Sequence, residues 1–310
     1  MLITAATTLP LLLAPGALEV PEDSLSYVSD FVVFAGADET GKVLFAFDAN
    51  RGAEGDSAQA EHFQRLWIEG EGWSTLPGEG DVAVEEMWSL PCSDFWKLTG
   101  SAAAGLELSC EEAKLTLEVA PLEDRTWREL DGDIFATGAA TATLTLNERA
   151  IRGHVLHEYC YLSTRNPLAK TYTDLFGDGF HGVYAIVGEG ENLRPFKYHR
   201  TGGTLRGLLK RSDGFAPANS AEGWQRLPDN TFEASDWDLA GFFSWPGRYQ
   251  VEWSEGEGET AARRSFDVRL RKREVVANYV IAGLAVNVLE GTVDLSGTPE
   301  PMFGLALVVR

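Results

Sequence analysis

The chain contains few cysteines, and their spacing argues against two common stabilising devices. Its 310 residues include only Cys92, Cys110 and Cys160, and no two of them form a Cys-x-x-Cys pair. An odd number of widely spaced cysteines is not typical of a disulfide framework, and the missing ligand pairs argue against a structural zinc site. We therefore expect a chain that folds in a reducing compartment, such as the cytoplasm.

Basic residues are also scarce. There are 26 lysines and arginines against 47 aspartates and glutamates, which gives a formal net charge of −21. A protein that binds nucleic acid needs a basic face to meet the phosphates, so this balance argues against a nucleic-acid partner. It argues more weakly against docking on anionic lipid. The simplest interpretation of the acidic excess is a surface that keeps the protein in solution.

Short motifs of several large enzyme classes are missing. The sequence has no Gly-x-Ser-x-Gly elbow, no Walker phosphate loop, no dinucleotide fingerprint and no His-Glu-x-x-His zinc motif. No predicted helix follows the pair Gly202-Gly203, so this pair lacks the helix N-terminus that phosphate binding needs. Acidic turns such as residues 131–133 lack the ligand spacing of a calcium loop. We therefore expect no cofactor and no metal.

No segment predicts a stable membrane span. Residues 1–25 form an apolar N-terminal segment, but Pro10 and Pro15 interrupt it. No lysine or arginine precedes its apolar run, and Pro15 lies at the −3 position of the plausible cleavage site after Ala17. The pattern therefore favours a mature segment that lies on the folded protein over a cleaved signal peptide.

Almost every stretch after residue 26 has the composition of β-strands and turns. Residues 27–35 and 42–48 predict the two strands of a first hairpin, joined by a glycine-containing turn. Further strands are predicted at residues 62–68, 82–90, 106–110, 114–119, 134–146, 153–162, 181–187, 193–200, 204–209, 231–237, 247–253, 264–271, 279–289, 291–295 and 304–309. Long segments with the period of a helix are absent; only residues 93–98 and 216–224 could hold short helical turns.

So many antiparallel strands must hide their edges, and closure into barrels or strong curvature does this. About eight strands in each half would make two small barrels, each wide enough for one ligand. The hydrophobic fraction of 44% is sufficient for two cores. We predict an all-β fold with an N-terminal barrel domain over residues 26–150, a C-terminal barrel domain over residues 151–310, and an apolar interface between them.

Three of the five histidines lie between residues 154 and 181. One predicted strand contains His154, His157 and Glu158, and another contains His181 and Tyr184. Histidine and a carboxylate are the usual side chains that move protons near neutral pH. Because alternate residues of a strand share a face, His154 and Glu158 lie on one face and His157 on the other, while His181 and Tyr184 lie on opposite faces. One cavity lined by His154, Glu158 and His181 is geometrically possible. The alternative is a set of ordinary histidines that are hydrogen-bonded inside a β-core.

Several short segments, in the right order, resemble the AttH-like and carotenoid 1,2-hydratase-like family. Residues 29–36 stand where that family has an early aromatic strand that leads to a glycine turn, although the family's tryptophan pair is replaced by Phe31-Val32. Residues 153–159 and 179–184 take the places of its two midway glycine-aromatic strands, with His157 at the position of an aspartate. Residues 288–297 resemble its late Glu-Gly strand. The resemblance implies a double lipocalin-type fold, with two calycin-like antiparallel β-barrel domains.

The same resemblance implies an activity, because the family includes hydratases, cyclases and isomerase-like proteins. The expected function is a cofactor-independent lyase, isomerase or cyclase that uses general acid catalysis on an apolar, terpenoid- or polyketide-like substrate in a barrel cavity. Glu158 is the expected general acid, with His154 or His181 tuning it and Tyr184 as a second donor. Burial in an apolar cavity keeps a carboxyl group protonated and able to donate near neutrality.

Two other classes of function stay open at this point. One is a non-catalytic, lipocalin-like binding protein for a hydrophobic small molecule, and the other is a scaffold without a cavity. Ionisable side chains that point into the cavity would favour the enzyme, whereas a lining of Trp, Phe, Leu and Val alone would favour binding. The expected partner of the first two is a hydrophobic small molecule. The sequence does not predict the oligomeric state.

Overall fold

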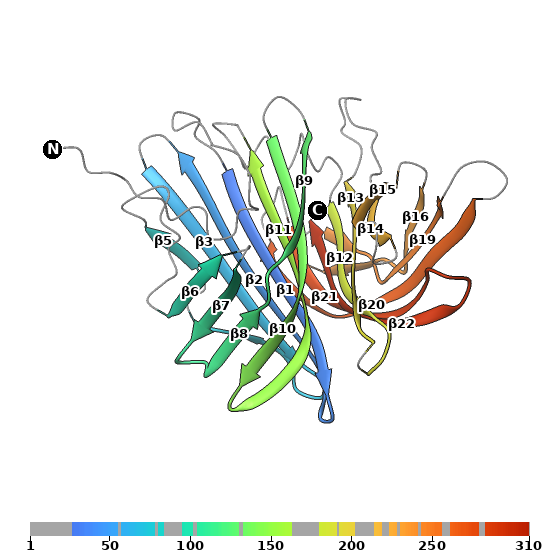
Figure 1. Ribbon diagram of the computed structural model, residues 1–310. Helices are drawn as coiled ribbons and strands as arrows, with labels where there is room; N and C mark the ends of the chain where they lie inside the picture. Colours follow the sequence, from blue (N-terminus) through green and yellow to red (C-terminus); the bar gives the residue numbers. More distant parts are fainter. Residues whose placement is uncertain are drawn as a thin grey trace. The chain divides into compact units, whose positions relative to one another are not determined.

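The computed structural model describes residues 27–54, 57–77, 80–83, 95–101, 104–129, 133–162, 180–190, 192–201, 214–218, 223–227, 230–240, 243–255, 261–278 and 283–309. Their regular structure is β-strand throughout (Figure 1), which confirms the predicted all-β class. No helix in these ranges is long and apolar enough to cross a membrane. The apolar segment at residues 1–25 and the strand expected at residues 204–209 lie outside the described ranges.

The chain divides into two compact units, Met1–Pro167 and Leu168–Arg310. The first unit contains an eleven-stranded antiparallel sheet with the order β4-β3-β2-β1-β11-β10-β8-β7-β6, in which β5 also pairs with β3 and β9 with β10. Its strands are β1 (Tyr27–Asp38), β2 (Gly41–Glu54), β3 (Ser57–Ile68), β4 (Gly72–Thr75), β5 (Gly80–Ala83), β6 (Trp96–Ser101), β7 (Gly105–Cys110), β8 (Leu115–Val119), β9 (Glu123–Glu129), β10 (Asp133–Leu146) and β11 (Arg149–Leu162).

The second unit contains a seven-stranded antiparallel sheet with the order β13-β12-β22-β21-β20-β19-β16, and two short hairpins, β14-β15 and β17-β18. Its strands are β12 (Phe180–Val187), β13 (Arg194–Thr201), β14 (Gly214–Ala218), β15 (Gly223–Leu227), β16 (Asn230–Ser235), β17 (Asp238–Ala240), β18 (Phe243–Trp245), β19 (Arg248–Glu255), β20 (Ala262–Asn278), β21 (Gly283–Asp294) and β22 (Pro299–Val309).

Two local expectations differ from this arrangement. The short helical turns considered at residues 93–98 and 216–224 do not form in the described residues, because β6 begins at Trp96 and because β14 pairs with β15. Pairing with a neighbouring strand outweighs the weak local preference of such short segments. The boundary between units also lies later than residue 150: β11 pairs with β1 from Gly153 to Leu162 and so belongs to the first sheet. An even division of strand number along the sequence does not reveal which strands pair.

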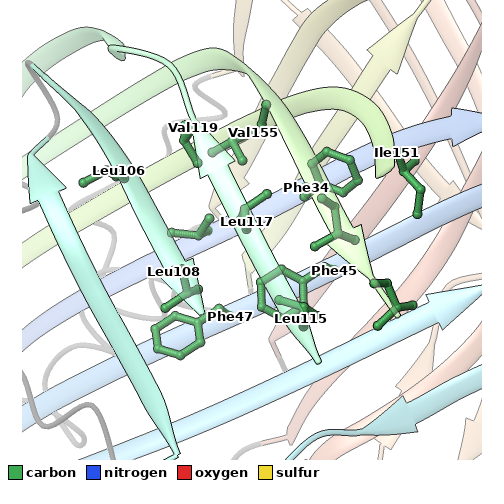
Figure 2. Close-up of a cluster of buried hydrophobic side chains, with 14 of the residues drawn as sticks. Phe34, Phe45, Phe47, Leu106, Leu108, Leu115, Leu117, Val119, Ile151 and Val155 are labelled. Atoms are coloured by element: carbon green, nitrogen blue, oxygen red, sulfur yellow. The ribbon is translucent and has the colours of Figure 1, made fainter. Parts of the chain in front are cut away.

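The first sheet has one face that carries its hydrophobic core, which we call the core face. Phe34, Phe45, Leu117, Ile151 and Val155 lie there, from four different strands, and Figure 2 shows their side chains gathered in one cluster. All of them are fully or almost fully buried. Removing such a side chain from water contributes about 1.5–3 kcal/mol relative to exposure. We call the other side of this sheet the opposite face.

The second sheet curls so strongly that strands far apart in its order touch through their side chains. Tyr198 of β13 donates a hydrogen bond to Asn230 of β16 at 2.8 Å, although these strands are the two ends of the sheet. In a flat sheet, six strand spacings would separate them by about 29 Å. His181 of β12 and Tyr249 of β19 are hydrogen-bonded at 2.7 Å across four strand spacings. The sheet is therefore rolled into a half-barrel that side chains close.

Glycine is required at one point where the backbone of β1 lies close to β11. Gly153 lies opposite Gly36 in the register of this pair. A Cβ atom at Gly153 would lie 2.2 Å from the carbonyl oxygen of Ala35 and 2.7 Å from the Cα of Gly36. Both obstacles are backbone atoms, which cannot rotate away as the end of a side chain can.

Gly153→Ala should therefore destabilise the protein by about 2 kcal/mol or more, the cost of forcing extra volume into a filled site. Gly297→Ala is the matched control, because it lies in a turn at φ 90° with no atom within 4 Å of the added Cβ. Its cost is limited to about 1 kcal/mol of backbone strain. Urea unfolding of both variants measures the difference. Equal urea midpoints for Gly153→Ala and Gly297→Ala would contradict the close approach of the β1 backbone to Gly153.

A bidentate ion pair joins the turn between β1 and β2 to the start of β11. The Nε and Nη2 atoms of Arg149 donate to the two carboxylate oxygens of Asp38, at 2.6 Å each. The backbone N–H and the hydroxyl of Thr40 both donate to Asp38 at 2.8 Å. The hydrogen bonds from Arg149 hold the pKa of Asp38 well below its usual range.

Asp38→Asn should therefore lower the free energy of unfolding by about 1 kcal/mol at pH 7. A carboxyl group whose folded-state pKa is depressed stabilises the fold above its unfolded pKa of about 3.9, and loses that contribution as the pH falls through the folded value. The difference between wild type and variant should shrink between pH 5 and pH 2, as measured by urea unfolding at several pH values. Glu39→Gln, in the same turn, removes the same charge without this ion pair. A difference that stays constant over this pH range would contradict the assignment.

Candidate functional site

β11 presents its polar residues on two different sides of the first sheet. His154 and Glu158 lie on the opposite face, both half-buried, and His157 lies on the core face in line with Val155. His157 is only 1% exposed. Glu158 is paired in register with Phe31 of β1 and Thr137 of β10. The separation of His154 and Glu158 from His157 is the one predicted from strand alternation.

In the second unit, the other two predicted residues, His181 and Tyr184, lie on different faces of β12. His181 lies on the side of the sheet that carries the core, where its ring meets those of Tyr249 and Phe232 at centroid distances of 5.3 and 5.2 Å. Tyr184 lies on the other side and is fully buried. Lys197, its partner in register on β13, is buried as well, and its amine lies 5.2 Å from the centre of the Tyr184 ring. A cation over an aromatic face at this distance is attracted by the ring.

The four predicted residues thus divide between the units. His154 and Glu158 share one face of the first sheet, whereas His181 and Tyr184 belong to the second unit and lie on different faces of its sheet. Neither unit by itself brings His154, Glu158 and His181 into one cluster. The common cavity of these three residues stays a prediction.

Sequence reasoning missed two charged residues on the same face as Glu158. Asp48 of β2 is 8% exposed and is paired in register with Phe31, which is itself the partner of Glu158. Arg65 of β3 is 4% exposed and lies diagonally across from Asp48, two residues beyond the register partner Phe63. Its Nη1 donates to the backbone carbonyl of Gln64 at 2.9 Å. Charged side chains are rarely this buried unless they are paired or functional.

Aromatic rings flank these charged groups. The rings of Phe31 and Phe63, the two register partners of Asp48, lie with their centroids 6.0 Å apart. Trp67 follows Arg65 on the same face of β3 and is also buried. Apolar surroundings favour the neutral form of a carboxyl group, whereas a guanidinium favours the ionised form. Two carboxyl groups and one guanidinium on a single apolar face can therefore divide the roles of acid and base.

A small signal in the sequence marks these residues. Residues 43–48 and 63–68 are apolar at most positions on both faces, as expected for strands buried on both sides, and Asp48 and Arg65 are the charged exceptions. A charge inside such a strand indicates a specific partner or role. In the part of the chain that the structure describes, no group of three or more His, Cys, Asp or Glu is arranged to hold a metal ion.

Comparison with known proteins adds information on the fold. No protein-family model and no curated protein sequence matches the chain. An AttH-like protein from Nitrosomonas europaea superposes with a TM-score of 0.61 at 12% identity, over 95% of this chain and 98% of that one. Kievitone hydratase from Nectria haematococca gives 0.61 at 8% identity, over 98% and 94%. CghA with Sch210972 gives 0.53 at 10% identity, over 91% and 88%.

At sequence identities this low, the superpositions show a shared fold and do not show a shared chemistry. The superpositions extend over almost the whole of each chain, so they include strands of both units. The chain therefore has the double, lipocalin-type fold of the AttH-like proteins, as its sequence resemblance predicted.

Proposed function

We propose that this chain is a cofactor-independent lyase, isomerase or cyclase that acts on an apolar, terpenoid- or polyketide-like small molecule by general acid catalysis. The observation that carries the proposal is the arrangement of Glu158, Asp48 and Arg65 among aromatic rings on the opposite face of the first sheet. Strand spacing puts the Cα atoms of the two carboxylate residues about 10 Å apart, with Phe31 between them. A substrate over Phe31 would reach both.

In the proposed reaction, Glu158 donates its proton to one carbon of an alkene, which leaves a carbocation on the other. A water molecule or a hydroxyl group of the substrate then forms a bond to the cation and loses a proton. The first route gives hydration and the second gives ring closure. Asp48, beside the buried Arg65, is the proposed ionised partner that accepts this proton. Exclusion of water from the apolar face protects the cation until it is trapped.

The other predicted residues have less direct roles in this proposal. His154 lies four residues before Glu158, about 13 Å away along the strand, so we propose that it contacts the far end of the substrate instead of the acid. His181 and Tyr184 remain proposed secondary groups of the second unit, supported by their burial beside Tyr249 and Lys197.

Packing of the described side chains disfavours a substrate site in the middle of either core. Phe34, Phe45 and Leu117 fill the middle of the core face of the first sheet. In the second unit the stacked rings of Tyr198 and Phe232, 6.2 Å apart, occupy the inside of the half-barrel. Such packing leaves little room for a substrate in the middle of either core.

The structural neighbours support the class of reaction by analogy only. One of them is named as a hydratase, and another has been crystallised with Sch210972. The alternative function, a lipocalin-like protein that binds a hydrophobic small molecule without changing it, is supported by the aromatic lining around Asp48. Turnover of a bound probe distinguishes the two functions.

The test uses 2-prenylphenol, an apolar probe with one alkene and one hydroxyl group. Protonation of its alkene gives either a tertiary alcohol, 18 mass units heavier, or a cyclic ether of unchanged mass, and both products are resolved by liquid chromatography and mass spectrometry. Glu158→Gln should lower the rate by about 10²–10⁴-fold, the usual contribution of a general acid. Probe affinity and the urea midpoint should stay nearly unchanged, because the amide keeps the shape of the acid.

Glu118→Gln is the matched control, because Glu118 is an exposed residue of the first sheet and this variant should keep full activity. A probe that binds to wild type and is never converted would establish the binding function instead. If Glu158→Gln unfolds the protein while the activity per folded molecule is unchanged, Glu158 is a structural residue.

A further inference from the structure

Gln64 is a fully buried amide on the core face of the first sheet. It lies on β3 opposite Phe47, and its exposed fraction is 0%. Neither its side-chain oxygen nor its side-chain nitrogen has a hydrogen-bond partner among the residues that the structure describes. Burying both atoms without partners costs free energy, and a leucine or methionine would fill the same volume without that cost. The amide therefore indicates a partner that reaches it from the core side.

A second polar residue shares the register row of Gln64. The row runs from Gln64 through Phe47 and Val32 to His157, which is also buried on the core face. At this end of the sheet it is the last core-face row whose side chains the structure describes. Towards the β1–β2 turn, the next row continues the apolar core. In the other direction the strands continue for several residues, to Ser57 in β3 and Leu162 in β11.

We propose that Gln64 is the hydrogen-bonding floor of a ligand site on the core face of the first sheet. The site takes a neutral group that both donates and accepts, such as a hydroxyl or a lactam, on an otherwise apolar small molecule. An amide offers one acceptor and two donors, so it complements such a group at both atoms. Phe47, whose ring lies 5.6 Å from that of Trp96, supplies an aromatic wall beside it. A charged group is disfavoured, because the described side chains of this row include no permanently charged partner for it.

This site is separate from the one proposed for catalysis. Glu158, Asp48 and Arg65 lie on the opposite face, and Gln64 is the neighbour of Arg65 in the chain with its side chain on the other side of the sheet. The inference therefore does not rest on the proposed function. An ordered water molecule is the competing occupant, since buried waters commonly satisfy polar atoms of this kind.

Two probes of nearly equal shape test the site by fluorescence titration. 2-Naphthol carries a hydroxyl that donates and accepts, whereas 2-methoxynaphthalene can only accept. Wild type should bind 2-naphthol about tenfold more tightly than 2-methoxynaphthalene. Gln64→Leu should weaken 2-naphthol about tenfold more than 2-methoxynaphthalene and so abolish the discrimination, since the two probes differ by one hydrogen bond to the amide. Without ligand, Gln64→Leu should also unfold at a higher urea concentration than wild type, because the variant no longer buries an unpaired amide.

Asn287→Leu is the matched control. Asn287 is a buried amide of the second unit whose side-chain oxygen likewise has no partner, so its removal should leave 2-naphthol affinity unchanged. Gln64→Met is the second variant if Gln64→Leu does not fold, because methionine is unbranched and fits the same volume. Glu158→Gln should keep 2-naphthol binding intact, which separates this test from the catalytic one.

Three results would overturn the proposal. The first is the absence of saturable 2-naphthol binding to wild type. The second is discrimination between the two probes that persists in Gln64→Leu or is lost equally in Asn287→Leu. The third is a crystal structure soaked with 2-naphthol in which a water molecule alone occupies both amide atoms of Gln64.

Discussion

Side-chain hydrogen bonds between strands that are not neighbours hold the second sheet in its curled form. Backbone pairing fixes each strand to the next, but it does not decide how far the sheet rolls. The contact of Tyr198 with Asn230 joins the two end strands, and that of His181 with Tyr249 joins the strands next to them, so both contribute to this closure. His181 therefore contributes to the closure of this sheet, whatever part it has in chemistry, and its ring lies among aromatic rings at that position.

The same principle explains which parts of the site the sequence could predict. Strand alternation is a local property, so it correctly separated Glu158 from His157 and His181 from Tyr184. Pairing between distant strands is not local. The sequence therefore gave no reason to join β11 to β1, or to place Asp48 next to Phe31 and Glu158. The sequence also did not predict the short strands β6 and β14, because pairing with a neighbouring strand decides their conformation.

Burial on both sides of the central strands makes their two faces alike in hydrophobicity. In β2 and β3 nearly every residue of the packed stretch is buried, so neither face can be recognised from hydrophobicity as the one that meets solvent. Polar residues then become the informative ones. Gln64 and Arg65 are adjacent in sequence, point to different sides of one sheet, and support two different hypotheses: a ligand site on the core face and an acid–base site on the opposite face.

The close contact between Gly36 and Gly153 also helps to fix which side chains of β11 lie on each face of the sheet. A slip of β11 by one residue against β1 would exchange its two sets of side chains, so that His157 and Glu158 would trade sides. It would also bring Arg152 or His154 to the place where even one methyl group would collide with the backbone of β1. A mispaired β11 would thus carry a steric cost at this point in addition to the cost of misplaced polar groups. The glycine pair therefore favours one register of the strand that carries His154 and Glu158.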